Sequence, residues 1–112
     1  MATSKIKGGV QKFNCTRSSN LSTGIATGFY DSSSGIVRIN FTFNSNDAIT
    51  TDTTLYTIPS AYRPTETATG SAITWNGSIV NTGAALANSD GTIKEGASNT
   101  CTRGIGYIEY SI

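Results

Sequence analysis

The segment from Ile36 to Phe43 is the feature that most constrains how this chain can fold. Apolar side chains recur there at every second residue, and the residues between them, Arg38, Asn40 and Thr42, are polar. A repeat of two residues is the period of a β-strand that buries one of its faces. We therefore expect a half-buried strand in this segment, because a helix would place the same apolar residues on all sides.

The composition extends this preference to the whole chain of 112 residues. Isoleucine outnumbers leucine twelve to three, and threonine, with 18 copies, is the commonest residue. Both types are β-branched, and their stiff side chains suit a pleated sheet better than a helix. The sequence thus predicts an all-β fold, a single jelly-roll-like β-sandwich of about eight or nine short antiparallel strands.

Turn signals divide the chain into these strands. The segment Asp31–Gly35 should join the strand at 36–43 to a preceding strand as a hairpin. Asn76-Gly77 and Asp90-Gly91 have the chemistry of two further hairpin turns. Residues 44–52 are mostly polar and are expected to form a loop.

The organisation of the chain is expected to be simple. Residues 1–9 are short of apolar side chains and end in Gly8-Gly9, so they are expected to be a flexible lead-in. Residues 10–112 then form one β-sandwich head domain. A domain of this length has a thin core and buries only about two thirds of its surface, so burial against a partner is plausible from the outset.

Charge and residue usage argue against several classes of function. The formal net charge is +1 with no histidine, so we expect no nucleic-acid partner, and no apolar run is long enough for membrane insertion. Without histidine a conventional catalytic triad cannot form, and four of the seven carboxylates lie in turns that they would cap. We expect no enzyme, no cofactor and no metal site.

The two cysteines, Cys15 and Cys101, leave two possibilities open. They either form a bridge between terminal strands or remain two buried free thiols. The start of the chain lacks the apolar stretch of a secretory signal, which favours free thiols. Two cysteines without histidine cannot supply the usual ligand set of zinc.

Binding is the remaining function, and five residues are its candidates. Aromatic rings with nearby amides and cations are the usual means of holding a sugar. The candidate ligand-binding residues are Trp75, Asn76, Asp90, Arg103 and Tyr30. Trp75 adjoins a turn where loops gather, although it would serve equally well as a plug at the end of the core. Tyr56, Tyr107 and Tyr110 are expected in the core or an interface.

A resemblance makes this interpretation more specific. The segment Leu55-Tyr-Thr-Ile-Pro59-Ser-Ala-Tyr62-Arg63-Pro64 resembles a corner found in C-terminal head domains of bacteriophage tail-fibre and baseplate proteins. The Asn-Gly hairpin at 75–80, the Asp-Gly turn at 90–93 and the final strand around Gly106–Tyr110 follow in the same order. The resemblance covers residues 35–112 and includes no catalytic motif.

The resemblance implies a receptor-binding head that adsorbs to cell-surface saccharide of a bacterial host as a homotrimer. It places the protein in the virion, at the tail or baseplate tip beside other tail proteins, after synthesis in the host cytoplasm. The corner itself is expected to be structural, with Arg63 reaching back to carbonyl groups or to a neighbouring subunit. Alternative functions are a structural virion module that makes only protein contacts, such as a capsid fibre, decoration or baseplate connector, and a stand-alone bacterial lectin or adhesin.

Overall fold

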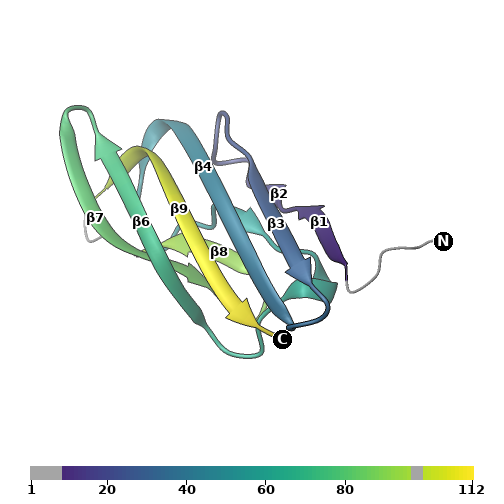
Figure 1. Cartoon of the computed structure of the whole chain (residues 1–112). Coiled ribbons are helices and arrows are strands. Elements are labelled where there is room, and N and C mark those ends of the chain that lie inside the picture. Colours follow the sequence, from purple (N-terminus) through teal and green to yellow (C-terminus); the bar gives the residue numbers. More distant parts are fainter. Residues whose placement is uncertain (1–8, 97–99) are drawn as a thin grey trace.

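The computed structural model describes residues 9–96 and 100–112, and these form nine strands and one short 3-10 helix (Figure 1). The strands are β1 (Val10–Asn14), β2 (Thr16–Arg17), β3 (Ala26–Asp31), β4 (Ile36–Ile49), β5 (Tyr56–Thr57), β6 (Ala68–Asn76), β7 (Ile79–Ala87), β8 (Thr92–Glu95) and β9 (Cys101–Ser111), with the helix η1 (Ser60–Tyr62) after β5. The predicted all-β fold with about nine antiparallel strands is confirmed. The lead-in expected at residues 1–9 lies outside the described residues, apart from Gly9.

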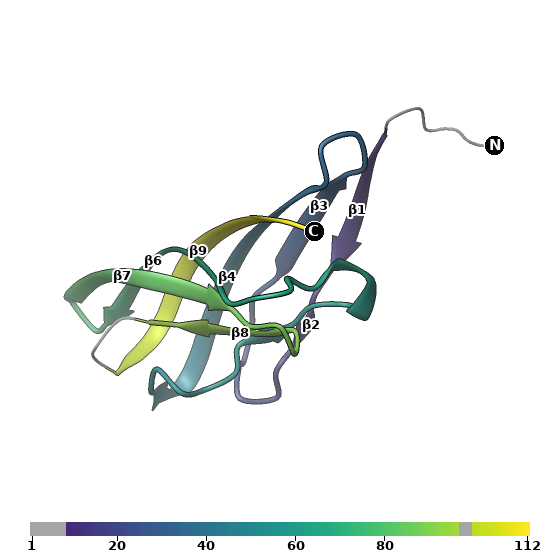
Figure 2. The same cartoon turned by 90° about the horizontal axis from the view of Figure 1, so that it is seen from below.

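All nine strands belong to one antiparallel sheet, which folds over to make both layers of the sandwich. Their order is β1-β3-β4-β9-β6-β7-β8-β5-β2. The larger layer consists of β1, β3, β4, β9, β6 and β7, and the sheet continues through β8, β5 and β2, with β8 and β2 lying across from the larger layer (Figure 2). The two edge strands, β1 and β2, are separated along the chain only by Cys15, so the sheet nearly closes on itself.

The three hairpins predicted from turn chemistry are present. Tyr30 pairs with Val37 across the β3–β4 turn, and β7 pairs with β8 around Asp90-Gly91. The β6–β7 hairpin is also present, but its two turn residues are Gly77 and Ser78 and not Asn76-Gly77, because Asn76 still pairs with Ile79. Gly77 has a φ of 62°, a left-handed conformation that favours glycine.

The prediction of a loop at residues 44–52 is wrong over most of its length, because β4 continues to Ile49. The strand continues there because β9 runs beside it. Asn44 pairs with Arg103, and after an irregularity in the register Ile49 pairs with Cys101. The neighbouring strand therefore satisfies backbone groups of a polar segment that has no strand pattern of its own.

The core is built around β4, whose alternate residues Val37, Ile39, Phe41 and Phe43 are all buried. The strand β9 allows these rings to pack closely by placing glycine opposite them. In the sheet register Phe41 faces Gly106 and Phe43 faces Gly104. A methyl group on Gly106 would lie 2.2 Å from the Phe41 ring, so these strand glycines provide room for the aromatic core.

The corner around Tyr62 and Arg63 ties the layers together. The Tyr62 ring stacks on Phe13 with centroids 4.2 Å apart, and its hydroxyl donates to Gln11 Oε1 at 2.9 Å. Arg63 Nε donates to the backbone oxygen of Ile58 at 2.8 Å, as expected for a residue that reaches back to a carbonyl. The motif that carries the family resemblance thus has a structural role in this chain.

Candidate binding site on the outer sheet face

The outer face is the side of β3, β4, β9, β6 and β7 that points away from the core. Burial alternates along these strands, so the residues that point outward are known from the pattern and the register. From β6 these include Ser71, Ile73 and Trp75. Within residues 9–96 and 100–112, no helix has the length and apolar character needed to cross a membrane, and no group of side chains is suited to a metal ion.

Two of the five candidate residues meet at one end of the outer face. Trp75 pairs with Arg103 across β6 and β9, and the Arg103 guanidinium carbon lies 4.5 Å from the centroid of the indole ring. Asn44 of β4 pairs with Arg103 from the other side and points outward as well. We call Trp75, Arg103 and Asn44 the tryptophan cluster; it joins an aromatic plane, a cation and an amide. Asn76, next along β6, points to the opposite side of the strand, where it donates from Nδ2 to the Thr100 hydroxyl at 3.2 Å.

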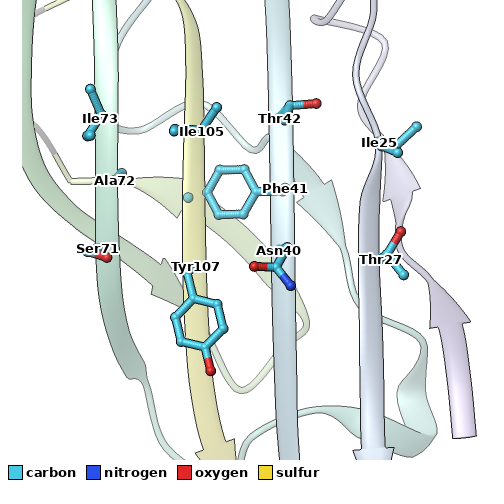
Figure 3. Close-up of a pocket in the computed structure, with 11 residues that line it drawn as sticks. Ile25, Thr27, Asn40, Phe41, Thr42, Ser71, Ala72, Ile73, Ile105 and Tyr107 are labelled. Atoms are coloured by element: carbon cyan, nitrogen blue, oxygen red, sulfur yellow. The ribbon is translucent and has the colours of Figure 1, made fainter.

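A groove of about 450 Å³ lies on the same face, next to the tryptophan cluster (Figure 3). Two rows of side chains cross the strands there. One row contains Ile73, Ile105, Thr42 and Ile25, and the other contains Ser71, Tyr107, Asn40 and Thr27. One row is thus mainly aliphatic, and the other offers hydroxyl and amide groups around one aromatic ring.

The Tyr107 ring is held in place by charged neighbours. Its hydroxyl donates to Glu109 Oε1 at 2.7 Å, and Arg38 Nε donates to the same oxygen at 3.1 Å. The hydrogen bond from Tyr107 lowers the pKa of Glu109, with Arg38 adding to the effect, and the same bond raises the pKa of Tyr107. The carboxylate is therefore ionised at neutral pH and accepts both donors.

Tyr30 and Asp90 lie away from the tryptophan cluster. The Tyr30 ring packs against the core, 5.7 Å from the ring of Tyr62 at the corner. Asp90 accepts hydrogen bonds from the backbone nitrogen and the hydroxyl of Thr92, which lower its pKa and cap its own turn. Neither residue therefore contributes to the arrangement that unites Trp75 and Arg103.

Sequence reasoning did not identify the groove as a site. Tyr107 is predicted in the core or an interface; the structure excludes the core, because Tyr107 lies on the outer face with 37 % of its surface exposed. The alternation in β4 did predict that Asn40 and Thr42 share the face opposite the core. The alternation could not predict the strand register, which sets Asn40 beside Tyr107 and Tyr107 beside Ser71.

A second hollow, of about 680 Å³, lies between the loop after β2 and the end of β4 with the segment that follows it. Its walls come from residues 19–22, 45–50 and 52–54. The Ser45 hydroxyl bonds to the backbone oxygens of Asn20 and Asp47, so these segments already satisfy part of one another's polar groups. The hollow has no aromatic lining, which makes it a weaker candidate for a sugar than the outer face.

Comparison with known proteins adds no family assignment, since no protein-family model and no curated protein matches this chain.

Proposed function

We propose that this protein is a receptor-binding domain of a bacteriophage tail fibre or baseplate, which adsorbs to cell-surface saccharide of a bacterial host as a homotrimer. The observation that carries the saccharide part of the proposal is the tryptophan cluster, with Arg103 stacked over Trp75 beside Asn44. The tail-protein part rests on the resemblance of residues 35–112 to phage head domains.

The chemistry of the tryptophan cluster suits a sugar. The apolar face of a pyranose ring packs on an indole plane, while its hydroxyl groups need donors and acceptors at the rim. The amide of Asn44 provides such groups on the same face, and the guanidinium of Arg103 adds a charged donor. Because Arg103 also rests on the ring, the indole is supported in a fixed orientation before any ligand arrives.

The outer face around the cluster carries little charge, so binding there would depend on contact and not on long-range attraction. Single contacts of this kind are weak. Three chains in one fibre tip, and several tips in one virion, would compensate through multivalency. This is the reason that the proposal includes a homotrimer.

The test is the binding of the fluorescently labelled full chain to an array of purified bacterial polysaccharides and to intact bacterial cells. Trp75→Ala should reduce binding about 10- to 100-fold, because one aromatic stacking platform is lost. Phe29→Ala is the matched control, since Phe29 is a half-exposed aromatic residue at the other end of the outer face. Circular dichroism verifies that both variants keep the sheet.

Two results would refute the tryptophan cluster as the site. One is unchanged binding by Trp75→Ala, and the other is an equal loss in Phe29→Ala. If Trp75 matters, Asn44→Ala should show a smaller loss of binding in the same direction, because only one hydrogen-bonding side chain is removed.

The second candidate function is a structural virion module that makes only protein contacts. The aliphatic side chains on the outer face favour it, because Ile25 is 70 % exposed and Ile105 is 44 % exposed. In that case the labelled chain would bind none of the polysaccharides or cells, and it would instead be retained by purified tail or capsid proteins of the phage.

A further inference from the structure

The tip of the β6–β7 hairpin contains the only Asn-Gly pair of the chain. Of the nine asparagines in the sequence, Asn76 alone is followed by glycine. An asparagine side chain closes onto the backbone nitrogen of the next residue with least hindrance when that residue is glycine, because glycine has no Cβ beside the nitrogen. Gly77 and Ser78 are both exposed, so water reaches this turn.

The backbone nitrogen of Gly77 is available for such a ring closure. Within residues 9–96 and 100–112 it donates no hydrogen bond. A methyl group placed on Gly77 would have no atom within 4 Å, so no side chain packs over the turn at this position. The attacking nitrogen therefore has neither a competing partner nor a cover.

Asn76 is held by the sheet on one side only. It forms the last pair of the hairpin, with Ile79, whereas the pairing of β6 with β9 ends one residue earlier, at Trp75 and Arg103. Ile79 is 62 % exposed, so the tip buries little apolar surface. Ring closure requires rotation of the Asn76 backbone, and a terminal pair with so few contacts opens at a small free-energy cost.

The Asp90-Gly91 turn has the opposite arrangement. The backbone nitrogen of Gly91 donates to the backbone oxygen of Asn88 at 2.9 Å. Asp90 Oδ1 accepts hydrogen bonds from the backbone nitrogen and the hydroxyl of Thr92, at 3.0 and 2.7 Å. These bonds lower the pKa of Asp90, so its carboxyl group is ionised at neutral pH, the form that resists attack by a nitrogen. The two turns are similar in sequence and differ in reactivity because of their hydrogen bonds.

Asn88 provides an internal reference among the asparagines. Its side-chain amide is held at both ends, because Nδ2 donates to the Thr92 hydroxyl and Oδ1 accepts from the Thr67 hydroxyl, each at 3.1 Å. The amide of Asn76 has one such bond, from Nδ2 to the exposed hydroxyl of Thr100 at 3.2 Å. Less must therefore be broken before Asn76 reacts.

We propose that Asn76 is a site of spontaneous deamidation, in which water is the reagent and the chain itself brings the reacting atoms together. The Gly77 nitrogen loses its proton to solvent and bonds to Cγ of Asn76. The bond between Cγ and Nδ2 breaks, and the nitrogen takes up a proton and leaves as ammonia. One water molecule then opens the five-membered imide. Cleavage between the Gly77 nitrogen and Cγ gives aspartate, and cleavage between that nitrogen and the main-chain carbonyl carbon gives isoaspartate.

The modification changes the end of β6 that carries Trp75. Either product replaces a neutral amide with a carboxylate and removes the donor that bonds to Thr100. Isoaspartate also adds one carbon atom to the backbone immediately after Trp75. The inference concerns the chemistry of the hairpin and does not rest on the proposed function.

The experiment incubates the folded full chain at pH 8 for several weeks and follows amide-to-acid conversion by peptide mass spectrometry, with fragmentation that separates aspartate from isoaspartate. Conversion at Asn76 should be at least about 10-fold faster than at Asn88, and it should yield both products. Gly77→Ala should slow it about 10-fold, because the methyl group hinders the attacking nitrogen. Thr100→Val should accelerate it about 5-fold, because the one hydrogen bond that restrains the amide is lost.

Ser89→Gly is the matched control, because it places a glycine after Asn88 as well. In the folded variant Asn88 should still react about 10-fold more slowly than Asn76, whereas in concentrated urea the two sites should react at similar rates. Conversion at Asn76 that is no faster than at Asn88 overturns the proposal, as does a rate that Gly77→Ala leaves unchanged. Equal rates at the two sites of the folded Ser89→Gly variant would show that the fold does not select Asn76.

Discussion

Gly28 provides the sharpest test of how this small core is packed. In the register of β1 and β3, Gly28 lies opposite Phe13. A methyl group on Gly28 would lie 2.1, 2.3 and 2.6 Å from three atoms of the Phe13 ring. The ring cannot retreat, because Tyr62 stacks on it at a centroid distance of 4.2 Å and an interplanar angle of 6°.

We expect Gly28→Ala to reduce the free energy of unfolding by about 2 to 3 kcal/mol, the upper part of the range for overpacked cores. Phe13→Ala alone should cost about 3 kcal/mol, because it empties a buried aromatic site. In the Phe13→Ala background, the added methyl group has space. Gly28→Ala should then be neutral or stabilise the chain by about 0.5 kcal/mol, the ordinary advantage of alanine over glycine in a strand.

The assay is equilibrium unfolding in urea, followed by the fluorescence of Trp75, on the wild type, the two single variants and the double variant. The coupling free energy from this cycle should be about 2 to 3 kcal/mol. Gly77→Ala is the control, because it has a left-handed φ but no atom within 4 Å of the added methyl group, and its cost should not depend on Phe13. A cost of Gly28→Ala that is the same in both backgrounds would refute the steric argument.

Two further predictions concern the thiols and the corner. Burial raises the pKa of Cys15 to about 12 and that of Cys101 to about 11, from a usual value of 9.0, so the unfolded chain loses these protons first. Their contribution to stability should be complete below pH 9 and decline as the pH rises toward 12, by on the order of 2 kcal/mol at pH 10.5. Urea unfolding at pH 8 and 10.5 measures this decline in the free energy of unfolding. A variant with both Cys15→Ser and Cys101→Ala is the control, and an equal decline in that variant would contradict its assignment to the thiols. Arg63→Ala should lower the free energy of unfolding by about 1 to 3 kcal/mol, because the Ile58 carbonyl loses its donor. Arg17→Ala is the control at an exposed position and should change it by less than about 1 kcal/mol. Equal losses in the two variants would contradict a structural role for Arg63.

The elements that sequence reasoning located correctly are those with local causes. The alternation from Ile36 to Phe43 reflects one strand with one buried face, and the glycine of Asn76-Gly77 allows the left-handed backbone of a hairpin turn. Both preferences act within a few residues. The segment 44–52 had no such local pattern, and its strand exists because β9 runs beside it.

The candidate site shows the same division. Trp75 was recognisable because it adjoins a turn, and Arg103 because guanidinium groups bind oxygens. Asn76 adjoins the same turn, but its side chain points to the opposite side of β6. Asp90 and Tyr30 have the same chemistry, yet the fold places Asp90 in its own turn and Tyr30 against the corner. Nothing in the residue types distinguishes the candidates that meet on the outer face from the candidates that the fold places elsewhere.

Local sequence thus accounts for the strand class, the hairpins and the alternation that separates buried from exposed residues, because backbone preference and side-chain period are properties of short segments. The tertiary structure alone decided that β9 lies between β4 and β6, which brings Arg103 over Trp75 and Tyr107 beside Asn40. Strand order depends on which distant segments bury the most apolar surface together while satisfying their backbone groups. That choice is made by the whole core at once, and it also decided which side chains the closed sheet leaves on its outer face.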